Sequence, residues 1–160
     1  MGEKLYVGVV GGSAFAQKSW DDALAIGREI ARRGAVLVCG GLGGVMEAAC
    51  RGAKEGGGTT IAFLPDEDRS RANDHIDHAL PTGMGEMRNM LIVRAADVVI
   101  AVGGEFGTLS EIGFALRIGK PVVGLETWEL AKSGEPSNAI VVAADPIEAV
   151  DRALGLVTGT

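Results

Sequence analysis

The stretch VVIAVGGEFGTLSE, residues 98–111, places groups that can bind an anion directly after an apolar run of β-forming residues. Glycines let backbone N–H groups approach a phosphate closely, and the start of a helix adds partial positive charge. Thr108 and Glu111 are three residues apart on one helix face, which sets a hydroxyl and a carboxylate beside the glycines. We predict a ligand site that contains Gly103, Gly104, Gly107, Thr108 and Glu111.

A basic residue, Arg88, lies near the start of the helix expected just before this strand, in the sequence GEMRN. An arginine there can orient a phosphate or pair with the Glu111 carboxylate. Each residue also has an ordinary structural explanation: Arg88 as a solvated surface charge, and Glu111 as a partner of the helix dipole. We predict Arg88 and Glu111 as the pair that would carry any catalysis.

Two further glycine loops, at 11–13 and 40–44, follow apolar runs in the same way. Ligands of open α/β sheets bind beyond the carboxyl ends of the strands, so all three loops are expected along one edge. One such loop is ordinarily a tight turn, but three on one edge favour a phosphate-bearing small molecule as the ligand. The predicted phosphate-binding residues in these two loops are Gly12, Ser13, Gly41, Gly43 and Gly44.

Apolar runs alternate with helical patterns along the chain, which predicts a three-layer, Rossmann-like α/β fold with a parallel sheet between helices. We treat residues 1–160 as a single domain. The polar segment 65–78 is expected to be a loop. Strands are expected at 5–10, 35–39, 59–64, 97–102 and 121–125, with a short sixth strand within 138–143.

The expected helices carry recognisable end signals. Ser19 is a plausible N-cap for the first helix, with Asp22 three residues on. Asp145 is expected to cap the last helix, where Pro146 occupies the first position and Glu148 closes a capping box.

Other candidate motifs give weaker signals. The stretch GGLGGV is followed by Met46, which stands where the third glycine of a G-x-G-x-x-G dinucleotide fingerprint would be. No lysine follows a glycine loop in the way that a P-loop requires. Arg69 and Arg71 can clamp a phosphate, but solvated loop charges are the favoured explanation for both. The DHIDH sequence at 74–78 has no matching ligands elsewhere, so no metal site is predicted.

Composition restricts the function further. Hydrophobic residues make up 47% of the chain, enough for a real core. The formal charge of −6 disfavours general binding to nucleic acid. The sequence has neither a signal peptide nor a membrane span, which predicts a cytoplasmic protein. Cys39 and Cys50 are expected to be buried free thiols.

These motifs resemble a known family. GGEFGTLSE is similar to the P-G-G-x-G-T-x-x-E signature of the Lonely Guy (LOG) proteins, with Gly107, Thr108 and Glu111 matching directly. GEMRN resembles the family's M-x-x-R-K element through Arg88. The glycine-rich stretches CGGLGGVMEAACRGA and VVGGSA also look like their family counterparts, so the resemblance extends over residues 4–126.

The resemblance implies a Rossmann-like fold, commonly a dimer, and hydrolysis of the N-glycosidic bond of nucleoside 5′-monophosphates. Arg88 and Glu111 would then be catalytic, with the carboxylate stabilising charge on the ribose, and the glycines and Thr108 would hold the phosphate. Three positions depart from the family pattern: Gly103 stands in place of the proline, Glu105 replaces a glycine, and Asn89 replaces a lysine. The GMGEMRN and GGxxGTLSEI patterns look closer to the branch that holds molybdenum cofactor carrier proteins and related uncharacterised bacterial proteins. There is also a distant likeness to the DNA-processing protein DprA.

Two hypotheses follow. The first is a binding or carrier protein for a phosphorylated nucleotide-like or pterin ligand, such as the molybdenum cofactor. The second is a nucleoside 5′-monophosphate phosphoribohydrolase that releases free base and ribose 5-phosphate. Neither needs a further cofactor. Apolar residues within 87–96 and 110–119 also favour a homodimer or higher homo-oligomer.

Overall fold

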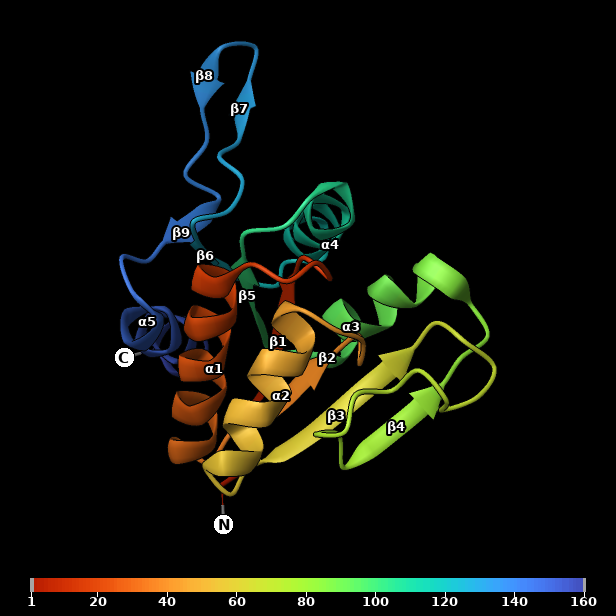
Figure 1. Ribbon diagram of the computed structural model, residues 1–160. Helices are drawn as coiled ribbons and strands as arrows, with labels where there is room; N and C mark the ends of the chain where they lie inside the picture. Colours follow the sequence, from red (N-terminus) through yellow and green to blue (C-terminus); the bar gives the residue numbers. More distant parts are fainter. Residues whose placement is uncertain (1, 160) are drawn as a thin grey trace.

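The computed structural model describes residues 2–159, which build one seven-stranded sheet covered by helices (Figure 1). All of its strand pairs are parallel, in the order β4-β3-β2-β1-β5-β6-β9. The sheet strands are β1 (Tyr6–Gly11), β2 (Val36–Cys39), β3 (Thr59–Leu64), β4 (His78–Pro81), β5 (Val98–Val102), β6 (Val122–Leu125) and β9 (Ile140–Val142).

Helices cover both faces of this sheet (Figure 1). One face carries α1 (Gln17–Arg32), α2 (Val45–Glu55) and α5 (Pro146–Thr158). The other carries the short 3₁₀ helix η1 (Gly85–Arg88), α3 (Asn89–Ala95) and α4 (Phe106–Arg117). The expected three-layer arrangement is therefore confirmed.

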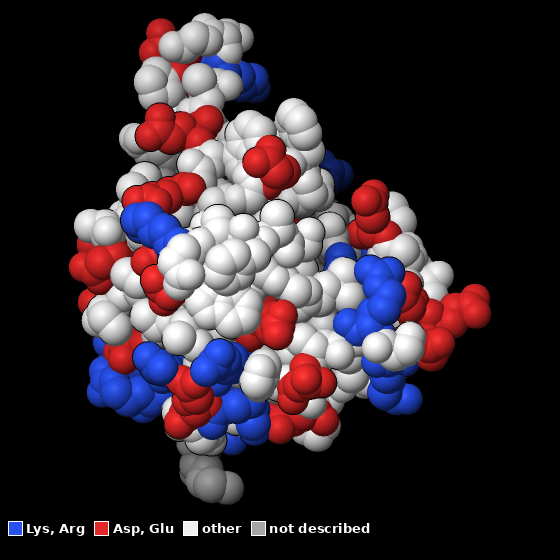
Figure 2. Space-filling view, in the orientation of Figure 1, with Lys and Arg blue, Asp and Glu red and all other residues white. Residues whose placement is uncertain are grey.

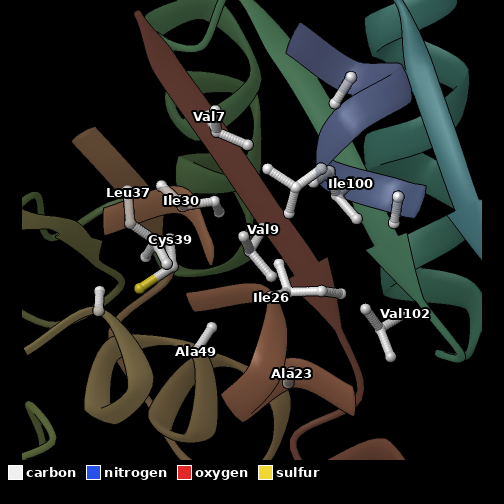
Figure 3. Close-up of a cluster of buried hydrophobic side chains, with 14 of the residues drawn as sticks. Val7, Val9, Ala23, Ile26, Ile30, Leu37, Cys39, Ala49, Ile100 and Val102 are labelled. Atoms are coloured by element: carbon white, nitrogen blue, oxygen red, sulfur yellow. The ribbon is translucent and has the colours of Figure 1, made fainter. Parts of the chain in front are cut away.

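The larger part of the core lies between the sheet and the α1–α2–α5 layer, and Figure 3 shows its centre. Ile26 and Ile30 of α1 are fully buried against strand residues such as Val9 and Ile100. Burying one such side chain contributes about 1.5–3 kcal/mol to stability. Strands flanked by helices on both faces must be apolar on both faces, which is why these strands are easy to recognise in the sequence.

The start of α1 differs from the sequence prediction. The N-cap is Ala16, not Ser19, and Ser19 lies within the first turn. The helix begins earlier: the Trp20 backbone donates to the Ala16 carbonyl at 2.9 Å, and the rings of Trp20 and Phe15 pack with their centroids 5.6 Å apart. The first turn of α1 consequently has no side-chain cap.

The sheet is also wider than the sequence predicted, because β4 begins at His78, the last residue of the expected polar loop, and continues to Pro81. It pairs with β3 from His78 opposite Ile61 to Pro81 opposite Leu64. Preceding it, Asp77 accepts hydrogen bonds from Lys54 at 2.7 Å and from the Thr60 backbone at 2.9 Å. A small hairpin of β7 (Ala131–Lys132) and β8 (Glu135–Pro136) was likewise not predicted.

The last helix begins as predicted. Asp145 is the N-cap of α5 and accepts a hydrogen bond from the Glu148 backbone at 2.8 Å, with Pro146 in the first turn. The Glu148 carboxylate in turn accepts from the Ala144 backbone at 2.9 Å, one residue before the N-cap. These contacts fix the helix start by satisfying N–H groups that the helix itself leaves free.

The two cysteines are free and buried, as expected, with their Sγ atoms 3.3 Å apart. The Cys39 contact and burial both raise the pKa of Cys50, which keeps that thiol protonated. Over the described residues, none of the helices combines the length and the apolar character that crossing a bilayer requires.

Candidate functional site

A cavity of about 560 Å³ lies at the carboxyl ends of the central strands. The strand order changes direction between β1 and β5, and ligands of open α/β folds bind in the crevice outside such a switch point. The residues in the cavity wall come from the segments 9–14, 40–46, 65–71, 85–92 and 105–111. Most of the glycine-containing segments that the sequence singled out thus meet at one place.

The start of α4 contributes backbone N–H groups to this region. Glu105 is the N-cap, and its side chain makes no capping hydrogen bond. Gly104 precedes it with a φ of +93°, where a Cβ atom would collide with the Thr108 side chain. The sharp turn therefore requires glycine, and it leaves the first-turn N–H groups available to an anion.

The start of α2 has the same character. Its N-cap is Gly44, at a φ of +66°, and there is no side-chain cap. The Val45 backbone donates to the Gly12 carbonyl at 3.0 Å, and a Cβ atom on Gly44 would collide with that carbonyl. Close packing of the two glycine loops brings the uncapped starts of α1 and α2 to the same edge of the sheet.

Thr108 and Glu111 are buried polar side chains in the wall of the cavity. Only 3% of Thr108 and 7% of Glu111 are exposed. No other residue within 2–159 makes a side-chain hydrogen bond with either of them. Buried polar groups normally have partners, so these two are free to bind a molecule in the cavity.

Burial raises the pKa of Glu111 to about 8, and the nearby charge of Arg88 opposes this rise only in part. The side chain is therefore mostly a neutral carboxylic acid at neutral pH. A neutral acid beside the glycine loop does not repel a phosphate, and it can donate a hydrogen bond or a proton. This removes the apparent conflict between a carboxylate and a loop suited to anions.

Arg88, at the end of η1, is 7% exposed and is held by three acceptors. Its Nε donates to the Phe63 carbonyl at 2.9 Å and its Nη2 to the Gly40 carbonyl at 3.3 Å. Its Nη1 donates to the side-chain oxygen of Asn89, which is also buried. Burial lowers the pKa of Arg88, while the Glu111 charge acts in the opposite direction. The guanidinium is thus fixed in position within the cavity wall.

The structure separates the predicted site residues into two groups. Some lie in the cavity wall: Gly12, Ser13, Arg88, Gly107, Thr108 and Glu111. The others shape the surrounding turns without lining the wall: Gly41, Gly43, Gly44, Gly103 and Gly104. Sequence reasoning missed Asp66, which enters the wall directly after Pro65. Its place at the carboxyl end of an apolar strand is a signal that could have found it.

The charged residues near the cavity differ in their positions and in their hydrogen-bond partners. Arg71 lines the wall and donates to Asp66 at 3.2 Å, whereas Arg69 donates to the Ala79 carbonyl and lies outside the wall. Glu105 is exposed at the cavity edge and makes no ion pair with Arg88. On the face shown in Figure 2, Lys and Arg gather on either side of a broad uncharged area.

No group of three His, Cys, Asp or Glu side chains in the described part of the chain is arranged to hold a metal ion. In the DHIDH segment, Asp77 is engaged by Lys54 and by Thr60. Its role there is to fasten the chain that leads into β4.

The doubly wound parallel sheet, with a cavity at its switch point, defines a Rossmann-like α/β protein. Within that class, the chain belongs to the SLOG cluster4 family, whose model matches residues 4–150. The likeness to LOG-type Rossmann proteins expected from the motifs is thereby confirmed.

Individual relatives agree with this assignment. The chain is 43% identical over 122 residues to an uncharacterized protein of Archaeoglobus fulgidus, covering 76% of this chain and 80% of that protein. The molybdenum cofactor binding protein of Rippkaea orientalis superposes with a TM-score of 0.89 at 35% identity, over 96% and 98% of the two chains. The molybdenum cofactor carrier protein of Chlamydomonas reinhardtii gives 0.84 at 34% identity, over 98% and 100%.

Proposed function

We propose that the protein binds and carries a phosphorylated nucleotide-like or pterin ligand in the cavity at the switch point. The observation that carries this proposal is the start of α4, where uncapped N–H groups adjoin the unpartnered Thr108 hydroxyl. A phosphate placed there would accept hydrogen bonds from both and would face the positive end of the helix dipole.

The rest of the cavity supports a ring-bearing ligand. Val10, Leu42, Met46 and Ile92 give the wall apolar surface, and the volume of about 560 Å³ suits a molecule the size of a nucleotide. The solved relatives described as molybdenum cofactor binding and carrier proteins favour a phosphorylated pterin as the ligand.

The position of Asn89 also favours a carrier. It replaces the lysine of the LOG motif, and its oxygen holds the Arg88 guanidinium. A lysine there could not accept this hydrogen bond, because an ammonium group has no acceptor. Asn89 thus removes a positive charge near the cavity and directs Arg88 toward the backbone carbonyls.

Calorimetric titration with ribose 5-phosphate, a minimal phosphate probe, tests the proposed phosphate site. Thr108→Val keeps the side-chain shape and removes the hydroxyl, so we expect affinity to fall about tenfold. Ser110→Ala is the matched control, because Ser110 is exposed on the next turn and bonds its own helix at the Gly107 carbonyl. Equal affinities of the two variants would contradict the proposed phosphate position.

Titration with purified molybdenum cofactor tests the pterin class directly. Saturable binding that Thr108→Val weakens and Ser110→Ala leaves unchanged is the expected result. A protein that binds ribose 5-phosphate but shows no saturable binding of the cofactor would rule out the molybdenum cofactor as the carried ligand.

A second candidate function, hydrolysis of nucleoside 5′-monophosphates, is favoured by Glu111. A carboxyl group with a pKa of about 8 in the cavity can protonate a departing base and then, as a carboxylate, activate water. Incubation with a panel of nucleoside monophosphates, followed by chromatography of free base, tests this. Release of base that Glu111→Gln abolishes and Ser110→Ala preserves would establish the hydrolase and exclude a pure carrier.

We also infer self-association through the outer surfaces of α3 and α4. Met87, beside α3, is 66% exposed, and Phe106 at the start of α4 is 75% exposed. Covering such side chains in a homodimer would be favourable. Light scattering after size exclusion tests this, and a monomer at micromolar concentration would contradict it. A cytoplasmic location and the absence of nucleic-acid partners stay predictions.

A further inference from the structure

Asp66 carries an unusual oxygen atom. Among residues 2–159, its Oδ2 is a solvent-shielded side-chain atom for which the chain supplies no hydrogen-bond partner. The other oxygen, Oδ1, accepts from Arg71 at 3.2 Å. A carboxylate has about four lone-pair positions, so this group retains most of its accepting capacity. Buried polar atoms are normally paired, and Asp66 lies in the cavity wall, where a ligand can supply the missing donors.

Asp66 and Thr108 enter the cavity wall after strands on different sides of the switch point. Asp66 follows β3, whereas Thr108 follows β5, and β2 and β1 lie between these strands. Three strand spacings correspond to roughly 14 Å, comparable with the length of an extended nucleoside monophosphate. Arg88 lies between these two positions, since it bonds the Phe63 carbonyl on β3 and the Gly40 carbonyl after β2.

The distance from the phosphate site decides which part of the ligand reaches Asp66. With the phosphate at Thr108, the ribose or an equivalent linker passes near Arg88 and Glu111. The heterocycle then lies against the apolar wall formed by Leu42, Met46 and Ile92, and its outer edge faces Asp66.

A carboxylate accepts two parallel hydrogen bonds from adjacent donors on one edge of a molecule. An exocyclic amino group next to a ring N–H provides this pair of donors, and guanine and the pterins share such an edge. Adenine has no such adjacent pair, because its amino group is flanked by ring nitrogens that accept. We propose that Asp66 is the specificity-determining residue of the cavity and recognises the amino and N–H edge of a guanine-type or pterin-type ring.

Access to the unpartnered oxygen requires only a local adjustment. The terminal torsion of an aspartate is broad and roughly two-fold, so rotation about χ2 turns Oδ2 toward a donor in the cavity. The Arg71 side chain, which bonds the other oxygen, is 61% exposed. We expect Asp66 to reach a ligand through this rotation alone.

This inference rests on the proposed function, because it takes the phosphate to lie at Thr108. Calorimetric titrations of the intact protein with GMP, IMP, AMP and ribose 5-phosphate test it. We expect GMP to bind roughly tenfold to a hundredfold more tightly than AMP, with IMP, which lacks the amino group, between them. Neopterin monophosphate is titrated beside GMP to distinguish a pterin ring from a guanine ring. The compound that binds with the higher affinity indicates which ring the site recognises.

Asp66→Asn replaces one acceptor by a donor at almost constant shape. We expect it to reduce the preference for GMP over AMP to about threefold or less, while the affinity for ribose 5-phosphate is unchanged. Glu67→Gln is the matched control, since it makes the same charge change on the neighbouring exposed residue outside the cavity wall. Arg71→Gln removes the ion pair but keeps the carboxylate, so it should retain the preference.

The outcomes distinguish the two proposals. If ribose 5-phosphate binds and Thr108→Val weakens it, but GMP is not preferred or Asp66→Asn leaves the preference intact, the role of Asp66 is wrong and the proposed function stands. If ribose 5-phosphate, the nucleotides, neopterin monophosphate and the molybdenum cofactor all fail to bind, the proposed function fails, and so does this inference, which rests on it.

Discussion

Arg88 and Glu111 line the same cavity, yet within residues 2–159 no ion pair joins them. The Arg88 guanidinium is engaged by Asn89 and by the carbonyls of Phe63 and Gly40. Glu111 is left buried, unpartnered and with a pKa of about 8. A direct ion pair would have lowered that pKa strongly. Burial is thus the main cause of the raised pKa of Glu111, and Arg88, held by other acceptors, offsets it only in part.

Stability should depend on pH through Glu111. Its pKa is about 8 in the folded protein and near 4.5 in the unfolded chain, so between these values only the folded state keeps the proton. The stabilisation is fully present below pH 4.5 and is lost as the pH rises toward 8, with a slope of up to about 1.4 kcal/mol per pH unit. Urea unfolding of the wild type and Glu111→Gln at pH 5, 6, 7 and 8 measures this slope.

The variant removes the titrating group, so its stability should change less with pH than that of the wild type. Glu86→Gln serves as the control, because Glu86 also lines the cavity but is exposed. Identical slopes for the wild type and Glu111→Gln would show that the carboxyl group ionises normally in the folded protein.

Asn89→Ala should destabilise the fold. The substitution removes the acceptor of the Arg88 Nη1 group and leaves a buried cationic donor without its partner. The cost of such a loss is about 1–3 kcal/mol in the free energy of unfolding. Chemical denaturation against Asn138→Ala, a change in an exposed loop, measures it. Equal stability of the two variants would mean that Asn89 does not hold the arginine.

The sequence predicts the central strands well for a physical reason. Strands such as β5 are buried on both faces, so each is a continuous apolar run whose ends are visible within about one residue. The same logic fails for β4, an edge strand that alternates between exposed and half-buried residues. Its pairing with β3 depends on tertiary contacts of Asp77 and Lys54, which no local pattern reveals.

For the candidate site, too, the sequence indicates some of the residues and not others. Arg88, Thr108 and Glu111 could be selected because they stand at helix starts beside glycine loops. Asp66 follows an apolar strand and not a glycine loop, so the sequence marks its position, but the missing partner of its Oδ2 within residues 2–159 is a tertiary property that no local pattern reveals. The early start of α1 was missed because its N-cap, Ala16, makes no side-chain capping hydrogen bond and so carries no capping signal in the sequence.

Gly104→Ala should weaken both the fold and phosphate binding. The residue has a φ of +93°, and the new methyl group would meet the Thr108 side chain. We expect a loss of about 1–3 kcal/mol in stability together with reduced affinity for ribose 5-phosphate. Gly113→Ala, inside the α4 helix that follows Gly104, is the opposite control, because the new Cβ would meet nothing within 4 Å and the change should stabilise the fold by about 0.5–1 kcal/mol. Two variants of equal stability would contradict the assigned turn.

The native thiols should resist modification. Cys39 and Cys50 are both 0% exposed and lie against each other, so a thiol reagent reaches them only when the surrounding core opens. We expect no release of chromophore from an aromatic disulfide reagent within minutes under native conditions, and two reacted thiols per chain in denaturant. Ser110→Cys provides a reactive surface thiol as a positive control. Rapid native reaction of the unaltered protein would show that the strand end beside the 40–44 loop opens readily, and it would contradict a rigid wall on that side of the cavity.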